Sequence, residues 1–217
     1  MMNGIKLNGI KLESSIPTRA EAEDIFAWAY EKNPEPWAKH CQTVARAAET
    51  IASKCGLNPE TAYIMGLFHD IGYCFYKNGK GSTCHIYSGY KLMMEKGYEA
   101  VARICLTHSF PSKDFRAYGG SDMTCSEEEK SFISAFIAEV EYDDYDKLIQ
   151  LCDCYGTAQG IVPVEKRLMN VVMRHGFNEF TVNVWESFLG IKEYFDAKCG
   201  TNINNLFCDE IKKSVFD

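Results

Sequence analysis

The sequence predicts an all-α fold, because apolar residues recur at spacings of three and four along most of the 217-residue chain. Strand patterns are almost absent, since no alternating run of valine, isoleucine and threonine is bounded by turn residues. Glycine, proline and capping residues separate the periodic segments at intervals typical of helices. We therefore expect one helical bundle.

Five helices are expected in the first half of the chain, and several have clear end signals. Gly56 stops the second helix, Asn58 caps the third, and Ser82 or Thr83 is the expected cap of the fourth. The third helix carries a strongly apolar segment that leads into the pair His69-Asp70. The expected ranges are 21–31, 37–55, 59–70, 83–97 and 101–108.

A long loop separates these helices from the second half. The stretch 111–126 contains proline, a glycine pair and mixed charges. Loops of this length in compact domains are usually functional or mobile, so we expect this one to act as a lid near His108. Helical patterns then resume over 127–140, 143–156, 163–175 and 180–198, with a short one near Ile211.

The domain organisation is expected to be simple. Residues 3–7 and 8–12 repeat the segment Asn-Gly-Ile-Lys-Leu, which is too short for a solenoid. We interpret residues 1–16 as an N-terminal extension and residues 17–217 as a single domain. An apolar content of 46% is ample for one buried core.

Charge and hydropathy argue against several classes of partner. The net charge of −7 and the lack of a concentrated basic segment disfavour a nucleic acid polymer. No segment approaches the apolar length of a membrane helix, and the N-terminus lacks the core of a signal peptide. The ten cysteines are scattered, so we interpret them as reduced thiols and expect a cytoplasmic protein.

Several ionisable residues fall where apolar residues are expected. His40, His69, His108 and Asp153 lie on or beside the apolar stripes of their helices. Inward-facing ionisable groups are costly unless they are paired or bind a metal. The adjacent His69 and Asp70 can reach one ion only near a helix end, and Gly72 fits such an end.

These residues, in this order, resemble the HD superfamily of metal-dependent phosphohydrolases, which is named after its His-Asp pair. The resemblance extends over about 37–156 and implies an HD-type helical bundle with this segment as its core motif. It implies that His40, His69, Asp70 and Asp153 bind a divalent ion. Imidazole and carboxylate ligands together suit Fe, Mn, Co, Ni or Zn better than Ca.

The resemblance also implies a reaction. Metal-activated water would attack a phosphate ester or anhydride of a nucleotide or related small metabolite, with Asp70 and His69 as catalytic residues. His85 and His108 resemble histidines of a two-metal branch, where they would complete a second ion's shell and Asp70 would bridge. The alternative is a one-metal site in which both histidines contact only substrate or water.

Substrate contacts are harder to assign. Some two-metal members carry a lysine where this chain has Tyr73, so Lys77 is one candidate phosphate ligand and Arg103 is another. Other members carry a glutamate at that place, which disfavours the nucleoside monophosphate subfamily here. Further basic residues that could contribute are Lys113, Arg116, Lys166, Arg167 and Arg174.

Two other functions remain open at this point. One is a non-catalytic metal-bound regulatory or binding module, because a fold does not determine function. The other is a di-iron oxygenase of the same fold, because the same ligands can hold redox-active iron. The oligomeric state is not predicted.

Overall fold

The computed structural model describes residues 16–34, 36–76, 84–118 and 124–216. The repeated N-terminal segment and Lys77 lie outside the described residues. The helices of the first half are α1 (Arg19–Lys32), α2 (Trp37–Cys55), α3 (Pro59–Phe68), η2 (Ile71–Phe75), α4 (His85–Glu95) and α5 (Glu99–Thr107). The second half contains η3 (Phe115–Ala117), α6 (Glu127–Glu139), α7 (Asp144–Tyr155), β1 (Gly156–Thr157), β2 (Gly160–Ile161), α8 (Val164–His175), α9 (Thr181–Cys199), η4 (Ile203–Phe207) and α10 (Cys208–Phe216).

Local capping explains where several helices begin. Reciprocal capping boxes start α1, α6 and α7, with Thr18, Ser126 and Asp143 as the N-cap residues. Asn58 caps α3 by accepting a hydrogen bond from the Thr61 amide, and proline occupies the first helical position. These caps satisfy amides that no preceding carbonyl can reach.

Helices α2 and α3 pack very closely, and this contact sets the position of the later metal centre. A Cβ added at Gly66 of α3 would lie 2.7 Å from Cα of Ala45 on α2. Only glycine therefore permits this approach of the two backbones. The contact brings the start of α2 beside the end of α3.

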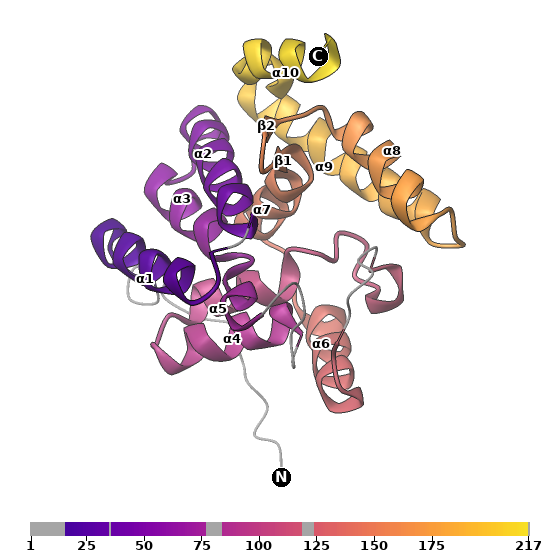
Figure 1. The fold of residues 1–217 in the computed structure, drawn as a ribbon. Helices are drawn as coiled ribbons and strands as arrows, with labels where there is room; N and C mark the ends of the chain where they lie inside the picture. The colour runs from indigo at the N-terminus through magenta and orange to yellow at the C-terminus, as the bar shows by residue number, and fades with distance from the viewer. Residues whose placement is uncertain (1–15, 35, 77–83, 119–123, 217) are drawn as a thin grey trace.

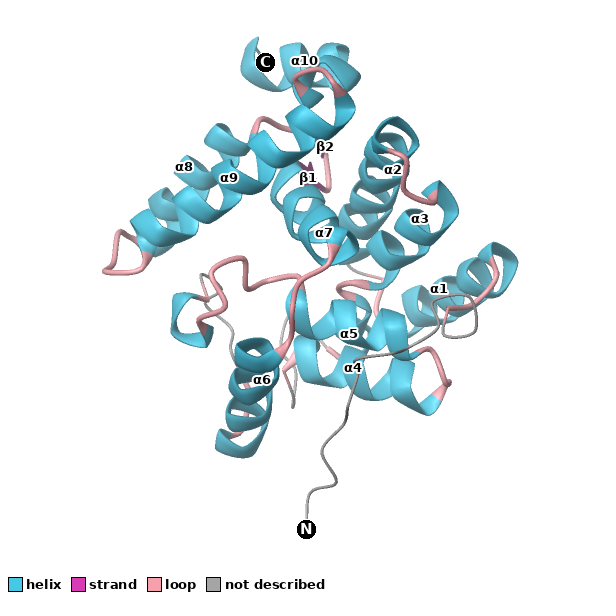
Figure 2. Cartoon of the chain, turned by 180° about the vertical axis from the view of Figure 1, so that it is seen from behind, coloured by secondary structure: helices cyan, strands magenta, loops and turns pink. Residues whose placement is uncertain are grey.

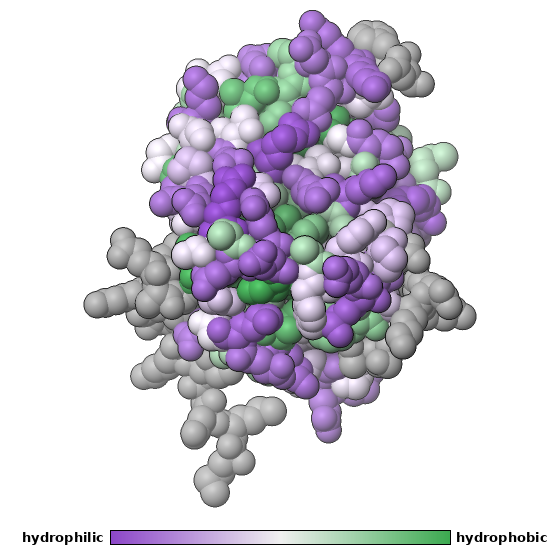
Figure 3. Space-filling view, turned by 60° about the vertical axis from the view of Figure 1, so that its left-hand side comes forward, coloured by the Kyte–Doolittle hydropathy of each residue, from purple (hydrophilic) through white to green (hydrophobic). Residues whose placement is uncertain are grey.

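The buried core has two parts that meet along α2. One part is formed by buried residues of the helices from α1 through α6. The other is formed mainly by buried residues of α2, α3, α7, α8 and α9. Figure 1 shows α7 between α4 and α5 on one side and α8 to α10 on the other, and Figure 2 shows the same arrangement from behind. Polar residues cover most of the face in Figure 3, with apolar residues visible between them in small groups.

Helix α10 is held against α2 by an ion pair between Arg46 and Glu210. Arg46 of α2 donates two hydrogen bonds to the carboxylate of Glu210, at 2.8 and 2.7 Å. The same carboxylate accepts a hydrogen bond from the amide of Ile161 in β2. One acidic side chain therefore connects α10, α2 and the short hairpin.

The all-α prediction is confirmed, with differences in detail. The hairpin of β1 and β2 was not predicted, because strands of two residues leave no periodic pattern. Helix α4 begins at His85 with Cys84 as its N-cap residue, and the predicted caps Ser82 and Thr83 lie outside the described residues. No helix in the described part of the chain is both long and apolar enough to cross a membrane.

The prediction that the cysteines are reduced thiols is wrong for one pair. Cys84 and Cys125 form a disulfide, with Cα atoms 4.6 Å apart. The pair is 41 residues apart in sequence, so local spacing could not indicate it. The other eight cysteines carry free thiols.

Candidate metal centre

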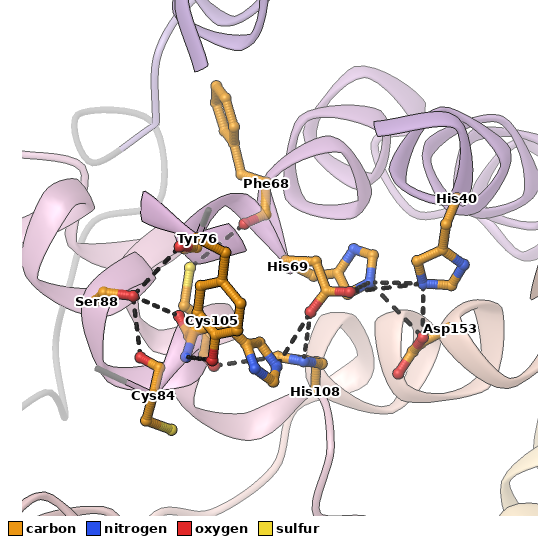
Figure 4. Close-up of polar contacts among 12 residues, drawn as sticks. His40, Phe68, His69, Tyr76, Cys84, Ser88, Cys105, His108 and Asp153 are labelled. Carbon is orange, nitrogen blue, oxygen red and sulfur yellow. Dashed lines mark hydrogen bonds and ion pairs between the residues drawn. The ribbon is translucent and has the colours of Figure 1, made fainter. Parts of the chain in front are cut away.

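Side chains from five helical segments converge on one buried point beside α7 (Figure 4). The end of α3 supplies a histidine-aspartate pair, which lies between α2 and α7 on one side and α4 and α5 on the other. The converging residues are His40, His69, Asp70, His85, His108 and Asp153.

The first half of the centre consists of His40, His69 and Asp153. Nε2 of His40 lies 3.1 Å from Nε2 of His69 and 2.9 Å from Oδ1 of Asp153. Nε2 of His69 lies 3.6 Å from the same carboxylate oxygen. Three potential ligand atoms therefore lie within 3.6 Å of one another, close enough to bind a single ion.

The second half consists of Asp70, His85 and His108. Oδ1 of Asp70 lies 3.3 Å from Nε2 of His85 and 3.2 Å from Nε2 of His108. Both histidines are almost fully buried, with side chains 4% and 1% exposed. Their ring nitrogens are therefore shielded from bulk water except through the centre itself.

Asp70 joins the two halves through its two carboxylate oxygens. While Oδ1 faces His85 and His108, Oδ2 lies 3.5 Å from Nε2 of His69 and 3.8 Å from Nε2 of His40. A carboxylate in this position can contribute one oxygen to each of two neighbouring ions.

Backbone carbonyls set the orientation of two of the rings. Nδ1 of His69 lies 2.8 Å from the carbonyl of Gly66, and Nδ1 of His108 lies 3.0 Å from that of Cys105. A proton on Nδ1 satisfies these carbonyls, so loss of the Nε2 proton on metal binding would leave the Nε2 lone pair directed into the centre. A histidine that binds a metal through one ring nitrogen usually donates a hydrogen bond from the other, as Nδ1 does here.

The electrostatics keep both carboxylates ionised. Burial alone would raise the pKa of Asp153, but hydrogen bonds from His40 and His69 hold it well below its usual range. Burial likewise opposes ionisation of Asp70, yet the charge of His69 and the contacts with His108 and His85 lower its pKa. The centre therefore presents anionic oxygens.

The donor set fits a divalent transition metal. Ligands about 2.0 to 2.2 Å from one ion lie about 3 to 3.5 Å from each other in tetrahedral or octahedral geometry. Most of the separations between ligand atoms here fall close to that interval, in two groups that share Asp70. Four imidazoles and two carboxylates suit Fe, Mn, Co, Ni or Zn.

Cys41 of α2 lies beside the first half of the centre and could be mistaken for a ligand. Its sulfur falls within ligand-group distance of His69 and Asp70. Burial raises the pKa of the Cys41 thiol, whereas the two ligand groups without Cys41 contain only imidazole and carboxylate donors. We regard it as packing under His69.

Gly72, Tyr73 and Tyr76 set the position of His85 at the start of α4. A Cβ at Gly72 would overlap the carbonyl oxygen of His85, so glycine lets η2 approach the start of α4. The ring of Tyr73 stacks on the His85 imidazole with centroids 4.2 Å apart. The backbone amide of His85 donates a hydrogen bond to the hydroxyl of Tyr76, at 3.2 Å.

The centre opens into a cleft of about 830 Å³. The metal-centre residues His40, Asp70, His85, His108 and Asp153 line one side, and α8 with the start of α9 lines the other. Ala117 and Tyr118 of the loop predicted as a lid also line the cleft. Arg116 of this loop lies over the ring of Phe180, with its guanidinium carbon 5.2 Å from the centroid, so the loop reaches the turn between α8 and α9.

Arg103, predicted as a substrate contact, lies outside the cleft and is held by other partners. The Arg103 guanidinium donates to both carboxylate oxygens of Asp146 and to the carbonyl of Glu141. Arg103 does not line the cleft, because these contacts hold it at the junction of α5 and α7. Of the other predicted basic residues, Arg167 and Arg174 do line the cleft.

A family model described as the HD domain matches residues 37–157, more than half of the chain. No curated protein and no solved structure matches the chain.

Proposed function

The chain belongs to the HD domain family, and from this premise we propose that it hydrolyses a phosphate ester or anhydride of a nucleotide or related small metabolite. The superfamily is one of metal-dependent phosphohydrolases. The observation that carries the proposal is Asp70, whose two oxygens face separate groups of histidines on one side of a cleft of about 830 Å³.

We propose two ions rather than one. His40, His69 and Asp153 would hold the first ion, His85 and His108 the second, and Asp70 would bridge them. Both groups have nitrogen and oxygen atoms that face inward at similar separations. A one-metal site would not require His85 and His108 to lie this close to Asp70. Bound divalent ions supply a water of lowered pKa and polarise a phosphoryl oxygen.

The protein's own residues then have three tasks. The carbonyls of Gly66 and Cys105 keep the rings of His69 and His108 oriented, so the ligand set needs little rearrangement. Burial of His69, His85 and His108 excludes bulk water from behind the centre. The open side toward α8 admits the substrate and orients its phosphate.

The test is metal content and phosphate release for the wild type, Asp70→Asn and the control Asp24→Asn. Asp24 is exposed on α1, so its change removes the same charge far from the centre. We expect about two ions per chain, and release from a nucleotide panel that falls at least about 100-fold only in Asp70→Asn.

Other outcomes would contradict the proposal in different ways. One ion per chain with normal release would reduce His85 and His108 to contacts with substrate or water. Bound ions without release would favour a binding module, and oxygen consumption by the iron-loaded protein would favour an oxygenase.

A further inference from the structure

Two arginines of α8 line the same cleft as the metal centre. Arg167 and Arg174 are seven residues apart on α8, which is about two helical turns, so both lie on one face of the helix. Both line the cleft that also contains His40, Asp70 and Asp153. Helix α8 is anchored by its buried residues Val164 and Leu168, so the arginine face has a defined position.

Neither arginine is neutralised within the described part of the chain. No carboxylate there lies within ion-pair distance of either guanidinium. The acidic side chains among the described residues lining the cleft are Asp70 and Asp153, and both face the metal centre. Two uncompensated cations in one cleft are informative in a chain with a net charge of −7.

The like charges also affect each other. Partial burial lowers the pKa of the Arg174 guanidinium, and the nearby charge of Arg167 lowers it further. Such mutual repulsion is relieved when an anion binds between or beside the two groups. Guanidinium groups match phosphate oxygens through paired hydrogen bonds, so a phosphate is the anion that this wall suits best.

We propose that Arg167 and Arg174 bind a second phosphate of the substrate while the first lies at the metal centre, so that the substrate carries a chain of two or more phosphates. This inference rests on the proposed phosphohydrolase function. The cleft volume of about 830 Å³ lies in the range of sites for ligands much larger than one phosphate. Trp185 on α9 also lines this cleft and offers an aromatic surface to a ligand.

The test uses two probes on the metal-loaded protein, measured by titration calorimetry. Methylenediphosphonate carries two phosphonate groups that water does not separate, and orthophosphate carries one phosphate. The variant is Arg167→Gln/Arg174→Gln. The control is Lys212→Gln/Lys213→Gln, which removes the same charge from exposed positions on α10 away from the cleft.

We expect the arginine variant to bind methylenediphosphonate about 100-fold more weakly than the wild type, about ten-fold for each lost charge-assisted contact. The affinity of the arginine variant for orthophosphate should equal that of the wild type. The control variant should bind both probes as tightly as the wild type does. Unchanged methylenediphosphonate affinity, or equal weakening for both probes, would overturn the inference. If the probe test failed but Asp70→Asn still abolished phosphate release, the proposed hydrolase function would stand and only the second phosphate site would be rejected.

Discussion

At the scale of single residues, Gly72 is the position among the described glycines where one methyl group should have the largest effect. We expect Gly72→Ala to push the start of α4 away from η2, because its Cβ would overlap the His85 carbonyl. Overpacking of this kind costs about 1 to 3 kcal/mol of the free energy of unfolding. His85 would also be displaced from Asp70, so metal content should fall.

Urea unfolding and metal analysis of the Gly72→Ala protein check this expectation. Gly190 in the middle of α9 provides the control, since nothing lies within 4 Å of a Cβ added there. Gly190→Ala should raise the stability by up to about 1 kcal/mol and leave metal content unchanged. Normal stability and metal binding in Gly72→Ala would show that η2 can move freely.

The residues of the candidate centre were largely accessible to sequence reasoning. Inward-facing His40, His69 and Asp153 break the apolar pattern of their helices, and the structure brings them together. Arg103 shows the limit, because its partner Asp146 lies 43 residues further along the chain and no local spacing indicates the pair. The identity of the ligands remains a prediction that metal analysis must test.

At the scale of elements, a contact between α7 and α9 carries a pH-dependent part of the stability. Asp144 begins α7 and accepts hydrogen bonds from Tyr194, at 2.6 Å, and from Lys198. Burial opposes ionisation of Asp144, but the hydrogen bonds from Lys198 and Tyr194 outweigh it and lower the pKa. A lowered folded pKa means that ionised Asp144 stabilises the folded state at neutral pH.

We expect Asp144→Asn to lower the free energy of unfolding by about 0.5 to 1 kcal/mol at pH 7. The difference from the wild type should shrink as the pH falls below about 4, through the folded pKa, because the wild-type carboxylate is then protonated too. Urea unfolding between pH 3 and 7 measures this, with Asp24→Asn as the unpaired control. A difference that does not depend on pH would contradict the assignment.

The helices followed from apolar periodicity and capping residues, so their order and most boundaries were predictable. The hairpin of β1 and β2 was not, since its position depends on a close contact between Gly156 and Val44 of α2. The disulfide between Cys84 and Cys125 has the same origin in tertiary structure. Local signals predict elements, whereas contacts between distant elements need the folded chain.

At the scale of the whole molecule, the centre should contribute to stability when it holds metal. Its ligand atoms come from α2, the end of α3, α4, α5 and α7, which together span both parts of the core. An ion at 1,000 times its dissociation constant adds about 4 kcal/mol. For a chain of this size that corresponds to about 10 °C in the melting temperature.

Scanning calorimetry with and without a chelator measures this contribution. The wild type should melt at least about 10 °C lower after chelation, since each ion contributes about that much, and Asp70→Asn should show little change. An equal melting temperature in both conditions would show that the folded chain holds no ion tightly.

The long sequence separation within the first half of the centre has a consequence for the order of folding. His40 and Asp153 are 113 residues apart, yet their ligand atoms lie 2.9 Å from each other. Closing a loop of that length costs entropy that only the packed helices can offset. An ion therefore cannot nucleate this fold as zinc nucleates a small finger. An ion held by His40, His69 and Asp153 can find all three ligands only after α7 has docked on α2. The rate at which the refolding chain takes up this ion should therefore report that docking step.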